Sequence, residues 1–254
     1  MRAQGQPLGG RRVLVTGGSS GIGAAAAVAL RGAGASVALT GRSTAALASV
    51  ASRCDSGFLA ADLRVPEAAE SVVGWACHTL GGLDTVVCAA GSGWAGPFEK
   101  MTDVDIDAMI DVNLRVPMQT VRAALGALRD SPYGGVVLVG SIVGLVGVAE
   151  EVAYSAAKAG LAGFADALRL ELGDTLAVSL ISPAAVNTPF FDRRNRPYER
   201  RWPQPMPVER VAEAIVRAVI TGQPSRVIPS WMTIAAKLHG VAPGLYRVLA
   251  RRFA

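Results

Sequence analysis

The sequence has few cysteines and no long hydrophobic run. Its three cysteines (Cys54, Cys77 and Cys88) are odd in number and widely spaced, which argues against a disulfide framework and against a zinc site, so no metal is expected. No segment reaches the roughly 18 consecutive apolar residues of a membrane-spanning helix. Residues 1–10, which we expect to be flexible, lack the apolar stretch of a secretory signal. These absences together predict a protein of the reducing cytoplasm.

Acidic residues are scarce in the last quarter of the chain. From Arg193 onward there are 12 Lys and Arg but 3 Asp and Glu, whereas residues 1–192 contain 13 and 17. No element able to read a nucleic-acid groove accompanies this basic region, so nucleic-acid binding is not expected.

The apolar segments predict a parallel sheet. Continuous apolar runs such as 86–90 and 136–139 are typical of strands that are buried on both faces. With helical segments between the strands, this predicts one α/β domain over residues 1–254, a doubly wound Rossmann fold with ligands at the carboxyl ends of the strands. About seven strands are expected, near residues 12–16, 36–40, 57–61, 84–90, 135–140, 177–181 and 226–229.

Two local patterns indicate chemistry. The glycine turn Thr16 to Gly23 lies between an apolar strand and an alanine-rich helix, and such a turn lets backbone amides approach a pyrophosphate. Tyr154 and Lys158 are four residues apart, so on a helix they share one face. An ammonium about 5 Å from the phenol oxygen stabilises the phenolate by roughly 3.3 kcal/mol at an effective dielectric constant of about 20. Lys158 is therefore expected to lower the pKa of Tyr154.

The order of the motifs between residues 11 and 229 resembles that of the short-chain dehydrogenase/reductase family of the compact, single-domain type. The matching motifs are the glycine turn, Asp62-Leu63, Cys88 to Gly91, Asn113, Ser141, the Tyr154/Lys158 pair and Pro183 to Pro189. The resemblance implies an enzyme that interconverts a carbonyl and a secondary alcohol by hydride transfer. A non-catalytic NADP(H)-binding sensor or scaffold of the same fold is the alternative, which the presence of all four catalytic residues disfavours.

The resemblance also assigns roles to those four residues. Tyr154 is expected to be the acid/base and Ser141 the hydrogen-bond partner of the substrate oxygen. Lys158 would tune the tyrosine and bind the nicotinamide ribose, while the backbone carbonyl of Asn113 would anchor a water relay to that lysine. Cofactor contacts are expected at Gly17, Ser19, Ser20, Gly21, Ile22, Gly23, Arg42, Asp62, Leu63, Ala89, Gly91, Tyr154, Lys158, Pro183, Val186 and Thr188.

The end of the second strand predicts which cofactor is used. Gly41 stands where NAD-preferring enzymes of this fold carry an acid, and Arg42 offers a guanidinium to a 2′-phosphate. A charge-assisted contact of about 1.5 to 3 kcal/mol would favour NADP(H) by roughly 10- to 150-fold. Because Ser20 replaces a basic residue that is common in NADP-preferring relatives, Arg42 would hold the phosphate alone unless arginines of the lid help.

Two positions depart from the family pattern. Cys88 and Ala89 replace an asparagine pair, and Cys88 is interpreted as a small core hydrophobe rather than a redox switch. Ala184 replaces a glycine, which is costly only if its φ angle is positive.

The basic C-terminal quarter contains two expected functional segments. Residues 189–206 take the place of the substrate lid, where Phe190, Phe191 and Trp202 are expected to contact an apolar small-molecule or acyl substrate. Residues 230–254 form a basic amphipathic segment with apolar residues at 234, 238, 241, 245, 248, 249 and 253. This segment could cover apolar surface near the active site, or contact an anionic acyl substrate, an acidic carrier protein or a lipid surface.

The sequence also predicts that several copies of the chain associate. Helices that begin near Thr102 and Val152 pair between subunits in relatives of this type. In the second of them Leu161, Phe164, Leu168 and Leu172 recur at helical spacing, and such a face is more apolar than a monomer would comfortably expose. We therefore expect a homo-oligomer, either a dimer or a tetramer.

Overall fold

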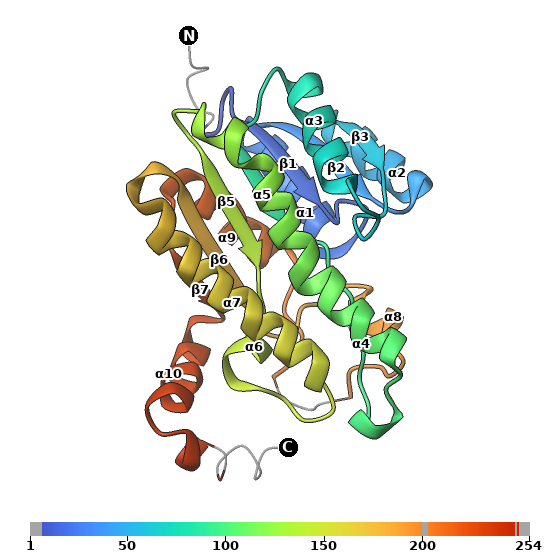
Figure 1. The fold of residues 1–254 in the computed structure, drawn as a ribbon, viewed down its shortest axis with the longest axis vertical. Helices are drawn as coiled ribbons and strands as arrows, with labels where there is room; N and C mark the ends of the chain where they lie inside the picture. The colour runs from blue at the N-terminus through green and yellow to red at the C-terminus, as the bar shows by residue number, and fades with distance from the viewer. Residues whose placement is uncertain (1–6, 200–202, 247, 249–254) are drawn as a thin grey trace.

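A seven-stranded parallel sheet forms the centre of the computed structural model, which describes residues 7–199, 203–246 and 248 (Figure 1). The strand order is β3-β2-β1-β4-β5-β6-β7, and every neighbouring pair is parallel. The predicted doubly wound fold is confirmed, and the strand order reverses between β1 and β4, where such folds bind ligands. The strands are β1 (Arg12–Thr16), β2 (Ser36–Gly41), β3 (Gly57–Ala60), β4 (Thr85–Cys88), β5 (Gly135–Val139), β6 (Ala177–Pro183) and β7 (Ser225–Ile228).

Helices cover both faces of the sheet. One apolar core lies between the sheet and α1 (Gly21–Gly32), α2 (Thr44–Cys54) and α9 (Glu209–Thr221). A second core lies between the sheet and α3 (Ala68–Leu80), α5 (Val116–Arg129) and α7 (Val152–Leu172). Every residue of β4 and β5 is buried, as their continuous apolar sequences predict.

Short helices gather below the carboxyl ends of the strands in the view of Figure 1. A Thr102–Asp105 capping box begins α4, which continues through a π-helical turn at Asp111–Arg115 into α5. The short helices are α4 (Asp103–Ile110), α6 (Val143–Val146), α8 (Phe190–Arg193) and α10 (Thr233–Val241), with 3₁₀ turns at Phe98–Lys100, Gly173–Thr175 and Ser230–Met232.

The inner face of α7 corrects one expectation. Leu161, Leu168 and Leu172 are at most 7% exposed and pack with Phe164 in the second core. They therefore cannot form an exposed face for a second subunit, because the sheet already covers them. The large apolar residues that α7 exposes are Val152 and Leu170.

An ion-pair cluster holds the amino-terminal edge of the sheet together. Asp84 accepts hydrogen bonds from the Arg12 backbone N–H (2.7 Å), from Arg12 Nη2 (2.6 Å) and from Ser131 Oγ (2.6 Å). Since Arg12 begins β1, Asp84 precedes β4 and Ser131 precedes β5, the cluster connects three central strands. Desolvation raises the pKa of Asp84, but the hydrogen bonds from Arg12 and Ser131 outweigh it and hold this pKa below its ordinary value.

The C-terminal segment lies beside the carboxyl edge of the sheet. Helix α10 contacts α6, and Ile234, Val241, Leu245 and Val248 are more than half exposed. Arg247 and residues 249–254 lie outside the described residues. Across the part of the chain that is described, none of the helices combines the length and apolar character needed to traverse a bilayer.

Candidate active site

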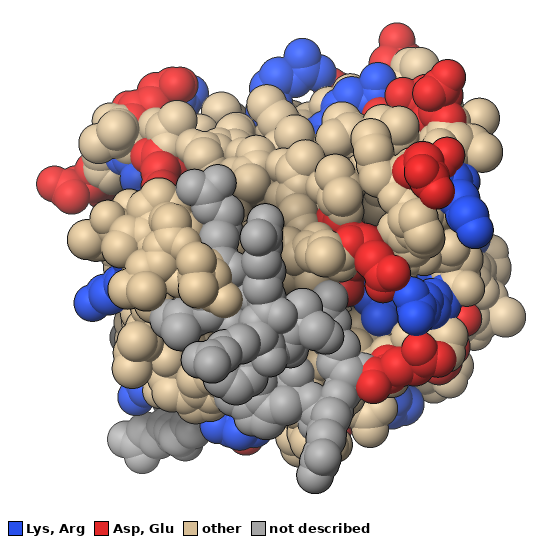
Figure 2. Space-filling model, turned by 90° about the horizontal axis from the view of Figure 1, so that it is seen from below, with Lys and Arg blue, Asp and Glu red and all other residues tan. Residues whose placement is uncertain are grey.

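A cavity of about 660 Å³ opens at the carboxyl edge of the sheet. Segments that follow all seven strands line it, from the turn after β1 to the segment after β7. In Figure 2, which views the molecule from this side, uncharged side chains form a broad area and charged ones lie mostly toward the rim. One cavity thus contains the glycine turn and three of the predicted catalytic residues.

Nearly all of the residues that the sequence predicted to bind cofactor line this cavity. The exception is Gly23, which is buried below the turn. Ser141, Tyr154 and Lys158 line it as well, together with Phe190 and Phe191, whereas Asn113 lies behind its wall and Trp202 lies outside the described residues.

The glycine turn fits a pyrophosphate because it brings bare backbone to the cavity. Gly17 has a φ of +68°, and a Cβ there would lie 2.6 Å from the backbone N of Ala90. A Cβ on Gly23 would lie 2.2 Å from the carbonyl oxygen of Gly17. Helix α1 has no acid in its first turn, and Ser20 at its N-cap makes no side-chain capping bond. The N–H groups of this helix start are thus available to an anion.

Three arginines line the cavity near that turn. Arg42 follows β2 as predicted, Arg64 pairs with Asp62 at 2.6 Å, and Arg193 Nη1 of the lid donates to Ser20 Oγ at 3.0 Å. The hydrogen bond from Arg64 lowers the pKa of Asp62 to about 2, with burial opposing and Arg42 assisting. The lid therefore supplies an arginine where Ser20 replaces a basic residue. Arg64 was missed, although it stands two residues after Asp62 in the same motif.

Tyr154 and Ser141 meet in the middle of the cavity wall. The side chain of Ser141 lowers the pKa of Tyr154, and Ser141 Oγ accepts from the N–H of Val143 at 3.2 Å. The Phe190 ring packs on the Tyr154 ring with centroids 5.6 Å apart. Burial raises the pKa of Tyr154, against a lowering by the hydrogen bond to Ser141.

The expected direction for the pKa of Tyr154 therefore differs from what the structure gives. Lys158 Nζ lies 5.8 Å from the tyrosine ring centroid and donates to the carbonyl oxygen of Val139 at 2.9 Å. Burial is the largest influence on the pKa of Tyr154, and the charges that act on this pKa are those of Glu151 and Arg194 rather than that of Lys158. Burial also lowers the pKa of Lys158, to about 8, so this lysine is charged at neutral pH but loses its proton more readily than an exposed one.

Close helix packing fixes the position of Lys158. A Cβ on Gly144 would lie 2.5 Å from the carbonyl carbon of Lys158, so α6 can approach α7 only with glycine at this position. The sequence reasoning missed Gly144, whose signal is its place three residues after Ser141.

Asn113 connects the helix layer to the loop after β4. It lies in the π-helical turn, and its Nδ2 donates to the carbonyl oxygens of Ser92 and Met109, both at 3.0 Å. Its Oδ1 is buried without a partner among the described residues. The side chain thus braces the cavity wall from behind, and the relay through its backbone carbonyl stays a prediction.

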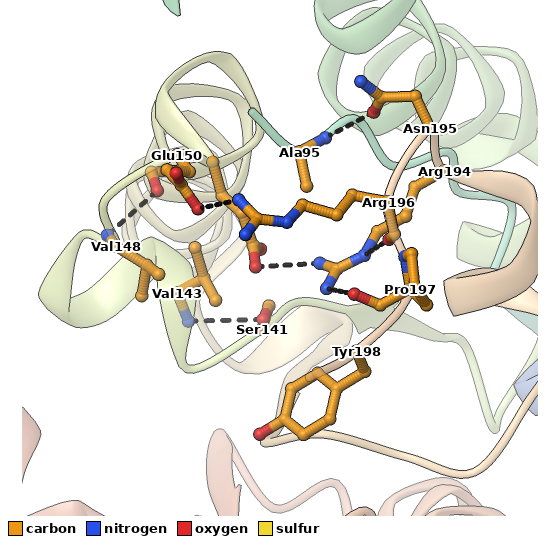
Figure 3. A network of polar contacts seen from close by, with 12 residues as sticks. Ala95, Ser141, Val143, Val148, Glu150, Arg194, Asn195, Arg196, Pro197 and Tyr198 are labelled. Atoms are coloured by element: carbon orange, nitrogen blue, oxygen red, sulfur yellow. Dashed lines mark hydrogen bonds and ion pairs between the residues drawn. The ribbon is translucent and has the colours of Figure 1, made fainter. Parts of the chain in front are cut away.

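The lid is attached to the loops that follow β4 and β5 (Figure 3). Arg194 Nη1 pairs with Glu151 Oε1 at 2.8 Å, and Arg196 Nη1 pairs with Glu150 Oε2 at 2.8 Å. Asn195 Oδ1 accepts from the N–H of Ala95 at 2.9 Å.

The C-terminal segment closes another side of the cavity, since Met232 and Tyr246 line it. Two residues of this segment therefore lie at the cavity, and its covering of apolar surface there stays a prediction.

The two departures from the family pattern are accommodated. Cys88 is 2% exposed and burial raises its pKa to about 12, so it is a core residue, as interpreted. The non-glycine residues with positive φ in the described part are Asp55, Glu67 and Glu150. Ala184 is not among them, and its replacement of glycine causes no backbone strain.

Comparison with known proteins agrees with this geometry. The family described as short chain dehydrogenase matches residues 11–199. An uncharacterized oxidoreductase of Staphylococcus aureus (strain MW2) is 33% identical over 228 residues, covering 87% of this chain and 95% of that protein. D-beta-hydroxybutyrate dehydrogenase of Cupriavidus necator is 31% identical over 215 residues, covering 82% and 83%. A short chain dehydrogenase from Burkholderia cenocepacia J2315, solved in complex with NADP, has a TM-score of 0.78 at 30% identity, covering 87% and 97%. The chain belongs to the short-chain dehydrogenase/reductase family of oxidoreductases.

Proposed function

We propose that the protein is an NADP(H)-dependent oxidoreductase that interconverts a carbonyl and a secondary alcohol on an apolar small-molecule or acyl substrate. The observation that carries the proposal is that Ser141, Tyr154 and Lys158 line the same cavity as the glycine turn. A protein that only binds a nucleotide needs the turn but has no use for a positioned proton donor.

The cofactor would lie along the predicted contacts, with its pyrophosphate at the glycine turn and the start of α1. Arg42 and Arg193 are the cations that favour a 2′-phosphate, and the NADP complex of the Burkholderia cenocepacia relative supports this choice. When bound, the nicotinamide exchanges a hydride with the reacting carbon.

The chain's own residues handle the oxygen and its proton. In the direction of reduction, Tyr154 donates its phenolic proton to the substrate oxygen while Ser141 donates a hydrogen bond to that oxygen, on which charge accumulates. The protonated Lys158 stabilises the phenolate that results, because an ammonium at this distance favours the anion. Phe190 lies against Tyr154 and excludes water from this point.

We also propose that the protein is a homo-oligomer. The exposed apolar residues of the α4–α5 and α7 layer support an interface on its outer side, namely Val104, Met118, Val152 and Leu170. Light scattering of the purified protein should give the mass of a dimer or tetramer, and a monomer at micromolar concentration would rule it out.

The test of the function is Tyr154→Phe, assayed as NADPH consumption with a panel of apolar ketones and aldehydes. We expect kcat to fall by at least about 100-fold while the NADPH dissociation constant stays within a few-fold, because only the proton donor is removed. Tyr246→Phe changes another tyrosine of the same cavity and should retain most of the activity. A Tyr154→Phe enzyme with more than a few per cent of the wild-type rate would disprove the acid assignment. Tight NADPH binding without turnover of any carbonyl would favour a sensor.

A further inference from the structure

A buried carboxylate borders the substrate half of the cavity. Glu151 lines the cavity three residues before Tyr154, and its side chain is 12% exposed. Apolar residues such as Val148, Phe190 and Met232 line the same cavity. A charged group in such surroundings needs a partner, because an unpaired buried charge is strongly destabilising. Arg194, whose side chain is 6% exposed, is that partner.

Arg194 is held in place by contacts that do not involve Glu151. Its Nε donates to the carbonyl oxygen of Arg196 at 2.9 Å, and Nη2 lies 3.5 Å from that of Pro197. Its guanidinium carbon lies 4.7 Å from the centroid of the Phe191 ring. Nη1 is the atom that reaches Glu151. In Figure 3 Arg194 extends from the lid toward the loop that carries Val148 and Glu150. The guanidinium is therefore preorganised to bind a carboxylate whether or not Glu151 supplies it.

The pair is also close enough to the reacting group to act on it. The charge of Glu151 raises the pKa of Tyr154 and that of Arg194 lowers it. A substrate that reaches Tyr154 thus passes beside Glu151, and a substrate carboxylate at that point would meet a like charge while the arginine is already paired.

We propose that Glu151 occupies the place of a substrate carboxylate, so that the enzyme selects neutral carbonyl substrates and rejects acidic ones. The inference rests on the proposed function and narrows its substrate class. It also predicts a difference from the relative named D-beta-hydroxybutyrate dehydrogenase, whose name designates an acid. Removing the Glu151 side chain would leave Arg194 Nη1 facing a space that fits a carboxylate.

The experiment compares 3-oxobutanoate with its neutral ethyl ester in wild type and in Glu151→Ala. Wild type should prefer the ester, and the variant should raise the acid-to-ester ratio of kcat/KM at least about tenfold, the lower range of a charge-assisted hydrogen bond. Glu151→Ala/Arg194→Met should lose this gain. Glu150→Ala is the matched control, since Glu150 pairs with an arginine of the same lid but is half exposed; its ratio should stay at the wild-type value.

Binding of the two compounds to the NADP⁺-loaded protein, measured by calorimetry, decides the inference without turnover. The inference is supported if Glu151→Ala gains binding of the acid. If Glu151→Ala fails to fold, Glu151→Ser is used in its place. The inference is overturned if the wild type binds the acid as tightly as the ester. It is also overturned if Glu151→Ala leaves the acid-to-ester ratio of kcat/KM unchanged. Turnover that resists Tyr154→Phe would instead disprove the acid assignment of the proposed function and leave this result standing.

Discussion

Two arginine–carboxylate pairs lie at opposite edges of the sheet and differ in what surrounds them. At the amino-terminal edge the carboxylate is the more buried partner, with the Asp84 side chain 3% exposed and that of Arg12 29%. At the carboxyl edge the guanidinium is the more buried partner, with Arg194 at 6% and Glu151 at 12%. Asp84 joins strands of the core, whereas Glu151 borders the cavity and holds a lid. The same chemical pair thus joins core strands at one edge and, as we propose, selects the substrate at the other.

The largest expected effect separates stability from activity at the amino-terminal edge. Asp84→Ala removes the acceptor shared by Arg12 and Ser131 and should lower the free energy of unfolding by about 3 kcal/mol. Urea unfolding measures this change, and kcat/KM of the folded variant should stay close to wild type. Glu70→Gln alters an exposed pair with Arg122 and should change the free energy of unfolding far less, because water and salt screen an exposed ion pair. If both variants lower the free energy of unfolding by the same amount, the contrast between the buried pair and the surface pair is wrong.

A smaller effect is expected for cofactor choice at the carboxyl edge. Arg42→Ala should reduce the NADPH-to-NADH ratio of kcat/KM about tenfold, because one charge-assisted contact to the 2′-phosphate is lost. The ratio is measured with one carbonyl substrate, and Arg53→Ala on the exposed side of α2 is the control. If Arg42→Ala leaves this ratio unchanged, the contact to the 2′-phosphate is assigned to Arg193 instead, because its side chain reaches the glycine turn.

The pH dependence of stability should also separate the two edges, which act at opposite ends of the pH scale. The lowered pKa of Asp84 means that its contribution is present above the unfolded pKa of about 3.9 and is lost as the pH falls through the folded value. The pKa of Lys158 falls from 10.5 to about 8 on folding. The unfolded chain therefore binds the extra proton between these values, and stability should rise with pH there.

Thermal unfolding across pH checks both predictions. Asp84→Ala should flatten the acid limb of the profile, and Lys158→Met should flatten the alkaline limb. An alkaline limb that is the same in wild type and Lys158→Met would show that Lys158 is not desolvated as described.

Local sequence patterns predicted the sheet and most of the site, because each depends on a short run of residues. The apolar runs of β4 and β5 specify buried strands by themselves, and the Tyr154/Lys158 spacing needs only a helix. The contacts that were missed join distant segments, such as Arg193 to Ser20 and Arg194 to Glu151. In the sequence alone, the arginine and glutamate residues that make these contacts cannot be distinguished from charged residues on any protein surface.

Two expectations differed from the structure for reasons that no local pattern contains. The spacing of Leu161, Leu168 and Leu172 shows that one face of α7 is apolar, but the sheet, not a second subunit, covers it. The spacing of Tyr154 and Lys158 predicted an attraction that lowers the pKa of the tyrosine. This pKa also depends on how deeply the tyrosine is buried, and burial dominates.

The three attachments of the lid have a kinetic consequence. Arg194, Asn195 and Arg196 are consecutive, yet they are tied to Glu151, Ala95 and Glu150 on two different loops. Because the three residues are consecutive, we expect these contacts to break nearly together. We therefore expect the lid to open in a single concerted event. In that case product release, rather than hydride transfer, would limit the rate of turnover.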